Sequence, residues 1–209
     1  MNTASYQKCV KDDTYYTKVQ AEHNDVSGFW VNRALYAAKN FLEVVGANLF
    51  DDDTVADFGS RTGYVADMLK RITSLNPICV DISAEHIKVC ESKGFPAFAG
   101  RIENMSFLRD GEVDWGFCSH TLEHVKDYDA AVKELNRVVK RGLFIVIPME
   151  HEDAGDANPS HMRFSTNIHD YITPFEALGW KMGWECPPIP NAEDYDPESR
   201  SDYQVWLYR

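Results

Sequence analysis

The sequence lacks any long apolar segment. No run approaches the roughly 18 consecutive apolar residues that a transmembrane helix needs, and the polar residues 1–13 contain no apolar core of a signal peptide. We therefore expect a protein that makes no contact with a membrane and lies in the cytoplasm.

Positive charge is also scarce. The 21 Lys and Arg residues are outnumbered by 33 Asp and Glu residues, which gives a formal net charge of −12. Because a nucleic-acid backbone is bound through clustered basic side chains, we do not expect this chain to bind nucleic acid. The spacing of the basic residues Lys133, Arg137, Lys140 and Arg141 predicts the solvated face of one helix.

Cysteines are few and show no paired spacing. The chain has five, an odd number, and no Cys-x-x-Cys, which argues against a disulfide framework and against a zinc ribbon. Two of them, Cys79 and Cys118, fall in predicted strands, where a free cysteine acts as a small core residue. We expect reduced thiols.

The most informative segment that is present combines a strand, a tight turn and a helix. Residues 54–58 form a short apolar run, Gly59-Ser60-Arg61-Thr62-Gly63 follows, and residues 64–72 have a helical pattern. Such a turn directs backbone N–H groups and a helix N-terminus at an anionic or polar cofactor. A second strand, residues 77–81, ends in Asp81, where a carboxylate accepts from both hydroxyls of a ribose. The two segments predict a cofactor that contains a nucleoside.

One glycine of a dinucleotide site is missing. The pattern Gly-x-Gly-x-x-Gly uses its middle glycine to let a pyrophosphate approach the backbone, but this turn has only Gly59 and Gly63, with Arg61 between them. A pyrophosphate site is therefore not supported. Arg61 has a Cβ, so we expect the turn to hold it at a φ angle that is sterically allowed for a residue other than glycine, with the guanidinium turned outward.

Strands and helices alternate along the chain, which predicts an α/β, Rossmann-like doubly wound sheet of about seven mostly parallel strands with right-handed crossovers. The predicted strands are 54–58, 78–81, 97–99, 115–119, 142–147, 180–186 and 203–208. The predicted helices are 26–45, 63–73, one that begins at Ser83 as its N-cap, 130–140 and 173–178.

A length of 209 residues suits one domain. We assign residues 1–50 to an N-terminal helical cap, 51–150 to the cofactor-binding core, and 151–209 to loops on the substrate side and closing strands.

The segment Asp57-x-Gly59-x-x-x-Gly63 resembles the first motif of class I methyltransferases that use S-adenosylmethionine (SAM). The usual motif is acid-x-Gly-x-Gly-x-Gly, so Arg61 departs from it. The resemblance implies SAM as cofactor, S-adenosylhomocysteine as product, and a sheet closed by an antiparallel C-terminal strand. It places Asp57, Gly59, Ser60, Arg61 and Gly63 at the cofactor.

Two further segments resemble the parts of that family that hold adenosine. Asp81-Ile82-Ser83 is similar to the second motif, in which the acid binds the ribose and the next apolar residue packs on adenine. Residues 99–107 resemble the segment that lines the adenine pocket, which implies contacts from Arg101 and Ile102. Many relatives have an aspartate at the position of Arg101 that accepts from the adenine amino group, which an arginine does not do.

Residues 114–125 resemble the fourth strand and following turn of the small-molecule branch, often written strand–Ser–x–x–Leu–Glu–His–Val. This resemblance implies that Ser119 contacts the cofactor and that His124 is a structural residue of the turn. Histidine is the side chain suited to general-base work near neutral pH. We name His161 and His120 as the candidate bases; His151 lies in the same polar loop as His161, residues 150–165.

The letters His120-Thr121-Leu122-Glu123-His124 also spell a zinc-peptidase pattern. That chemistry needs both histidines on one face of a regular helix, a third ligand and a carboxylate directed at the metal-bound water. Because the segment directly follows a strand, we place His120 in a turn and predict no metal.

Near the start of the chain, Tyr15, Tyr16, Trp30 and Arg33 lie where similar enzymes cover the cofactor. Aromatic rings there would cover the sulfonium, although Trp30 also fits the core of a helix. Arg33 or Arg61 would pair with the methionine carboxylate.

Three functions stay open from the sequence. The first is SAM-dependent methyl transfer to a small molecule. The second is the same reaction on a macromolecule such as protein or RNA, which the acidic charge and the lack of an added recognition domain disfavour. The third is a non-catalytic partner subunit with a methyltransferase fold, suggested by Arg61 and Arg101 at cofactor positions. The methyl acceptor and the oligomeric state are not predicted.

Overall fold

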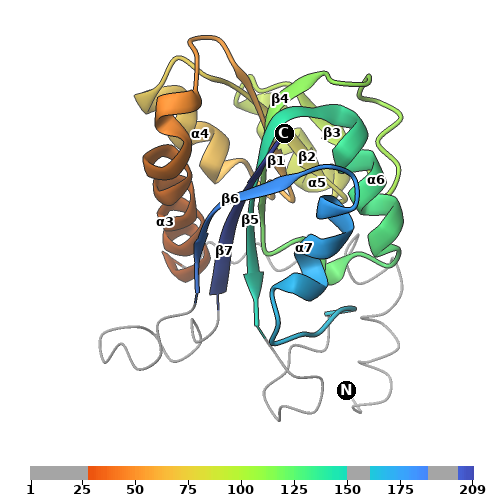
Figure 1. Ribbon diagram of the computed structural model, residues 1–209. Helices are drawn as coiled ribbons and strands as arrows, with labels where there is room; N and C mark the ends of the chain where they lie inside the picture. The colour runs from red at the N-terminus through yellow and green to blue at the C-terminus, as the bar shows by residue number, and fades with distance from the viewer. Residues whose placement is uncertain (1–27, 150–160, 188–201) are drawn as a thin grey trace.

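The computed structural model describes residues 28–149, 161–187 and 202–209. Seven strands form one sheet in the order β3-β2-β1-β4-β5-β7-β6 (Figure 1). The strands are β1 (Thr54–Phe58), β2 (Asn76–Asp81), β3 (Ala97–Ala99), β4 (Val113–Ser119), β5 (Val139–Pro148), β6 (Lys181–Cys186) and β7 (Asp202–Tyr208). β7 runs antiparallel to both of its neighbours, and the pairs from β3 to β5 are parallel. The predicted fold class is confirmed.

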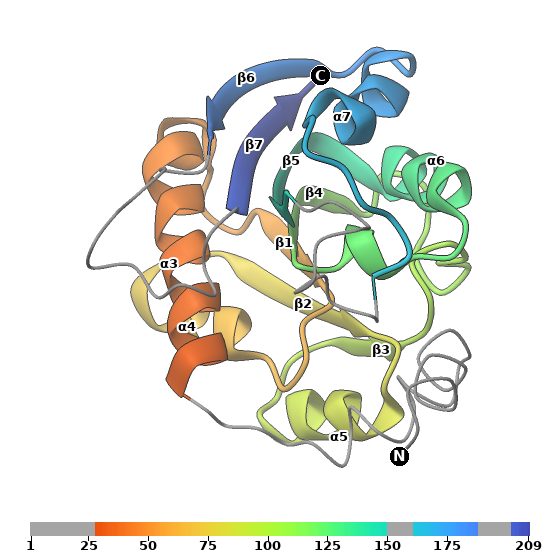
Figure 2. The same cartoon turned by 90° about the horizontal axis from the view of Figure 1, so that it is seen from below.

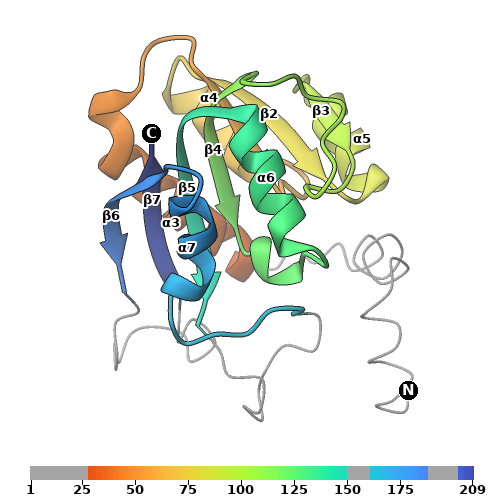
Figure 3. The same cartoon turned by 45° about the vertical axis from the view of Figure 1, so that its right-hand side comes forward.

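Helices cover both faces of the sheet (Figure 2). They are α3 (Gly28–Val45), α4 (Tyr64–Ile72), α5 (Ala84–Ser92), α6 (Tyr128–Val138) and α7 (His169–Glu176), with short 3₁₀ turns η2 (Gly46–Asn48) and η3 (Leu122–His124). Figure 3 shows α6 and α7 together on one face, whereas α3 lies behind the sheet. In the described part of the chain, no helix combines the length and the apolar character that crossing a bilayer requires.

The two faces of the sheet have separate cores because successive side chains of a strand point to opposite sides. On one face, Phe117 and Phe144 stack with ring centroids 6.0 Å apart and contact Phe41 of α3. On the other face, the neighbouring residues Cys118 and Ile145 pack in the cluster that contains α6 and α7. Because helices cover both faces, most residues of β1, β4 and β5 are buried, and most of these are apolar.

Several predicted boundaries differ from the structure. The helix predicted at 130–140 is α6, which begins at Tyr128 because Asp127 is its N-cap and accepts from Ala130 N–H. It ends at Val138, so Lys140 and Arg141 belong to β5, and the predicted single basic helix face was wrong. The helix predicted at 173–178 is α7, which begins at His169 and contains Pro174. The predicted N-cap Ser83 is confirmed, because its Oγ accepts from His86 N–H.

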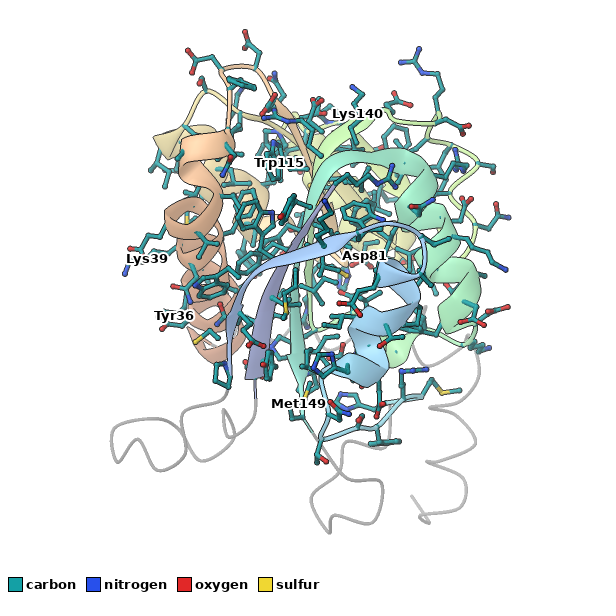
Figure 4. The ribbon with its side chains drawn as sticks, viewed as in Figure 1. Tyr36, Lys39, Asp81, Trp115, Lys140 and Met149 are labelled. Atoms are coloured by element: carbon teal, nitrogen blue, oxygen red, sulfur yellow. The ribbon has the colours of Figure 1, made fainter. Side chains whose placement is uncertain are left out.

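The parallel strands end at one edge of the sheet. Figure 4 shows Met149, just after β5, at this edge, and Lys140, near the start of β5, at the opposite edge. The turns after β1, β2 and β4 therefore meet there, which is where open α/β sheets bind ligands. The division into 1–50, 51–150 and 151–209 stays a prediction.

Candidate functional site

The turn after β1 is fastened to the end of β2. The N–H groups of Gly59 and Ser60 both donate to Val80 O, at 2.8 and 3.0 Å. One carboxylate oxygen of Asp81 accepts from Arg61 N–H at 2.8 Å. The two segments that the sequence predicted to hold one nucleoside are thus hydrogen-bonded to each other.

Asp81 is largely enclosed by protein donors. Its other oxygen accepts from Ser83 N–H at 2.8 Å and lies 3.2 Å from His86 Nδ1. The side chain is 8 % exposed. Because a carboxylate oxygen has two lone-pair sites, the oxygen bound to Arg61 N–H still has capacity for a second donor such as a ribose hydroxyl. Sequence reasoning missed His86, which gave no motif signal.

Asp57 lies deeper than Asp81. It is 4 % exposed, one strand away from Asp81 in the sheet. Burial raises the pKa of Asp57 well above its ordinary value, and the nearby charges of Asp81 and Cys90 raise it further. A carboxyl group with a raised pKa holds its proton more readily than a free aspartate.

Gly59 and Arg61 both have left-handed backbone. Gly59 has φ +87°, and a Cβ built there would lie 2.1 Å from Thr121 Oγ1. Thr121 is itself fixed, since its hydroxyl bonds to the carbonyls of Phe58 and Ser119. The turn after β4 therefore closes directly over Gly59, a contact with Thr121 that sequence reasoning also missed.

Arg61 has φ +48°. The sequence predicted an angle open to a residue with a Cβ, but this value lies in the small left-handed region that such residues rarely adopt. The backbone is held there on both sides: Arg61 N–H binds Asp81, and Arg61 O accepts from Cys90 Sγ at 3.3 Å. Strain held by several contacts is common at ligand-binding turns.

We predict that Arg61→Gly binds SAM within about threefold of wild type, because the contacts of this residue to Asp81 and Cys90 are made by its backbone. Arg61→Ala is the matched variant, since it also removes the guanidinium but keeps the Cβ. We expect Arg61→Gly to be more stable than Arg61→Ala by about 1 kcal/mol, the cost of a Cβ in left-handed backbone. Calorimetry and urea unfolding measure the two effects. A large loss of affinity in both variants would instead identify the guanidinium as a ligand of the methionine carboxylate.

The other predicted cofactor residues lie in different environments. Ser60 is buried, and among the described residues its Oγ has no hydrogen-bond partner. Arg101 pairs with Glu103 at 3.0 Å, and Ile82 and Ser119 are partly exposed. Ile102 is 5 % exposed and packs in the core, so the structure does not place it on an open surface.

The candidate base His120 directly follows β4. Its φ of +52° is a second strained angle at this edge. Its Nε2 lies 3.1 Å from an oxygen of Asp202, and its Nδ1 lies 3.5 Å from Glu123 Oε1. The predicted turn at His120 is confirmed, and the two carboxylates fix the orientation of the ring.

His161 and His124 gather around Glu123. His161 is 6 % exposed rather than part of an open polar loop. Its ring lies 4.7 Å from the ring of His124 and nearly perpendicular to it. Glu123 is fully buried; burial by itself would raise its pKa, but the neighbouring His120, His124 and His161 lower its pKa below the ordinary value. The sequence-based predictions assigned Glu123 no role in the site, although the His-x-x-Glu-His spacing was the available signal.

Some predicted residues cannot be placed. Tyr15, Tyr16 and His151 lie outside the described residues. Trp30 and Arg33 belong to α3, but their side chains are outside the description. Of the five cysteines, Cys79, Cys90 and Cys118 are free and buried, as expected for reduced core thiols.

Comparison with known proteins shows similarity in sequence and in fold. Residues 56–147 match the family model of the methyltransferase domain. No protein of curated function matches the sequence.

Solved structures share the fold at low identity. A chain from the Haloferax volcanii complex between the Trm112 methyltransferase activator and a proposed methyltransferase is 14 % identical, with TM-score 0.68 over 94 % of this chain and 96 % of that one. A SAM-dependent methyltransferase from Aquifex aeolicus is 15 % identical, with TM-score 0.57 over 85 % and 97 %. The geranyl diphosphate C-methyltransferase of Streptomyces coelicolor A3(2), solved with Mg²⁺ and S-adenosylhomocysteine, is 12 % identical, with TM-score 0.68 over 82 % and 74 %.

Residues 56–147 are therefore similar to a methyltransferase domain, and the chain has the fold of solved methyltransferases. The expected resemblance is confirmed, and the family match together with the fold supports SAM as the cofactor.

Proposed function

We propose that this chain binds SAM across the turns after β1, β2 and β4 and transfers its methyl group to a small-molecule acceptor. The observation that carries the proposal is the hydrogen bond from Arg61 N–H to Asp81, which joins the glycine turn to the acid at the tip of the neighbouring strand. Asp81 would accept a hydrogen bond from a ribose hydroxyl, and Gly59 leaves the space that Thr121 needs to close the turn after β4 over it. The cytoplasm remains the proposed location.

The reaction needs alignment more than activation, because the sulfonium already makes the methyl group electrophilic. A lone pair on the acceptor oxygen or nitrogen forms the new bond to carbon. The C–S bond breaks and its electron pair stays on sulfur, which gives S-adenosylhomocysteine. His120 would take the acceptor proton, since the carboxylates of Asp202 and Glu123 beside it stabilise the imidazolium that forms. If turnover is unchanged in His120→Ala, His120 is not the base; if it is unchanged in His161→Ala, His161 is not the base.

The test of cofactor binding is calorimetry with SAM and S-adenosylhomocysteine. We expect both to bind wild type, and we expect Asp81→Asn to weaken both by about 10- to 100-fold, since one hydrogen bond to a charged group contributes about 1.5–3 kcal/mol. Glu43→Gln is the matched control; it removes an exposed acid on α3 and should leave the affinity unchanged.

If neither ligand binds to wild type, the proposal is wrong and a non-catalytic partner subunit is favoured. If both bind, following labelled methyl from SAM into a metabolite pool identifies the acceptor. Label found only in protein or RNA would favour the macromolecular alternative.

A further inference from the structure

A buried carboxylate without a hydrogen-bond partner lies near the edge of the sheet where the parallel strands end and where we propose that methyl transfer occurs. Glu123 is in η3 and is 0 % exposed. Neither Oε1 nor Oε2 has a hydrogen-bond partner among the described residues. A buried charge is costly unless it is paired or coordinates a metal, and the histidines around this carboxylate can either pair with it or bind a metal together with it.

Two imidazoles face the same carboxylate oxygen. His124 Nε2 lies 3.9 Å from Glu123 Oε1, and His161 Nε2 lies 4.0 Å from it. One ligand atom from each of the three residues lies within 4.8 Å of the others. Each distance is too long for a hydrogen bond, which leaves room for an ion between the three side chains.

The backbone holds these three residues together. Glu123 O accepts from Met162 N–H at 2.7 Å and from Arg163 N–H at 3.2 Å, which fastens the segment after His161 to η3. His120 contacts Glu123 from another side at 3.5 Å. A residue that contacts a metal-binding carboxylate without binding the metal, as His120 would here, orients that carboxylate.

We propose that Glu123, His124 and His161 bind one divalent cation of the zinc class. Two imidazoles and a carboxylate are a ligand set of zinc enzymes. Zinc bonds of about 2.0–2.2 Å place tetrahedral ligands roughly 3.3 Å apart, so binding requires the three side chains to close by small rotations. Three protein ligands leave at least one position open, as catalytic zinc sites do. A hydroxyl or water bound there would lose its proton more easily.

This proposal differs from the sequence-based prediction of no metal, which remains a prediction. The sequence argument required a third ligand and two histidines on one regular helix. His120 and His124 indeed do not share a regular helix, but His161, which enters from beyond β5, supplies a different third ligand. Only the folded chain brings it to Glu123.

The experiment measures metal directly. Wild type is stripped with a chelator and dialysed, then titrated with Zn²⁺ in competition with a chromophoric chelator, and its metal content is read by mass spectrometry. We expect one Zn²⁺ per chain. Glu123→Gln and His161→Ala should each weaken Zn²⁺ binding by more than about 100-fold. This exceeds the roughly 10- to 100-fold loss that is typical when the changed residue only orients a metal ligand.

His169→Ala is the matched control, because His169 is exposed and outside the cluster; it should bind Zn²⁺ like wild type. Zn²⁺ should also raise the melting temperature of wild type and of His169→Ala, but not that of Glu123→Gln. Because a ligand raises the melting temperature only by binding the folded protein, this measurement also shows that each variant folds. Three outcomes would overturn the proposal: no stoichiometric Zn²⁺ on wild type, equal binding by all variants, or tighter binding of Mg²⁺ than of Zn²⁺. None of these readouts depends on SAM binding or methyl transfer.

Discussion

Gly59→Ala is expected to lower the free energy of unfolding by about 2–5 kcal/mol and to abolish detectable SAM binding. Two causes add. A Cβ in left-handed backbone costs roughly 1–2 kcal/mol, and φ at Gly59 is +87°. The added methyl group would also lie 2.1 Å from Thr121 Oγ1, and forcing an extra group into a packed site costs about 1–3 kcal/mol.

Thr121 cannot move away cheaply. Its hydroxyl donates to Phe58 O at 2.9 Å and lies 3.1 Å from Ser119 O, so the turn after β4 would have to shift with it. That shift would open the edge where the cofactor is proposed to bind. Urea unfolding and calorimetry with SAM measure the two consequences.

Gly94→Ala separates the causes. Gly94 has φ +84°, and a Cβ there would have nothing within 4 Å. It should therefore show the backbone cost alone, with SAM affinity unchanged. If Gly59→Ala and Gly94→Ala unfold at the same urea concentration, the contact between Gly59 and Thr121 does not exist in solution.

Asp57→Asn is expected to stabilise the ligand-free protein at neutral pH. The pKa of Asp57 is raised well above its ordinary value of 3.8 by burial and by the charge of Asp81. At a pH between the ordinary pKa of Asp57, which applies to the unfolded chain, and its raised pKa in the folded chain, the folded chain holds a proton that the unfolded chain has released. The free energy of unfolding of wild type therefore falls as pH rises through this window, by about 1.4 kcal/mol per pH unit.

The Asp57→Asn variant has no carboxyl group at this position, so its free energy of unfolding does not fall with pH for this reason. Thermal unfolding from pH 3 to pH 8 should show a melting-temperature difference, variant minus wild type, that is small near pH 3 and grows as the pH rises. In a chain of this size each kcal/mol corresponds to about 2–4 °C.

Asp114→Asn provides a control of opposite sign. Burial favours a raised pKa at Asp114, but hydrogen bonds from Thr54 and the charge of Lys140 lower the pKa below its ordinary value. Its contribution is present above the unfolded pKa and is lost as pH falls through the folded pKa. Asp114→Asn should therefore destabilise at pH 7. A constant difference between Asp57→Asn and wild type across the pH range would show that Asp57 is not shifted.

The cofactor side of the site was predictable because its determinants are local. A strand, a glycine turn and a helix occupy consecutive residues, so Gly59 and Gly63 could be assigned from spacing alone, and both have the positive φ that glycine permits. Asp81 could be assigned because it ends the next strand. Its partner His86 could not, because a hydrogen bond from a following helix leaves no periodic signal.

The histidine side of the site was only partly predictable. The turn at His120 followed from its position directly after a strand. The burial of Glu123 and the approach of His161 depend on backbone hydrogen bonds between segments separated by a whole helix and strand. The basic residues near 140 were misplaced because α6 passes into β5 without an intervening turn signal.

The sequence by itself determined the class of fold, the glycine turn and the acids at two strand tips, since these depend on the order of residues along short segments. Tertiary structure alone decided that Thr121 closes over Gly59, that Asp57 is buried beside Asp81, and that His161 lies beside Glu123. Such contacts join distant segments, and their energies depend on packing and desolvation that no local pattern encodes.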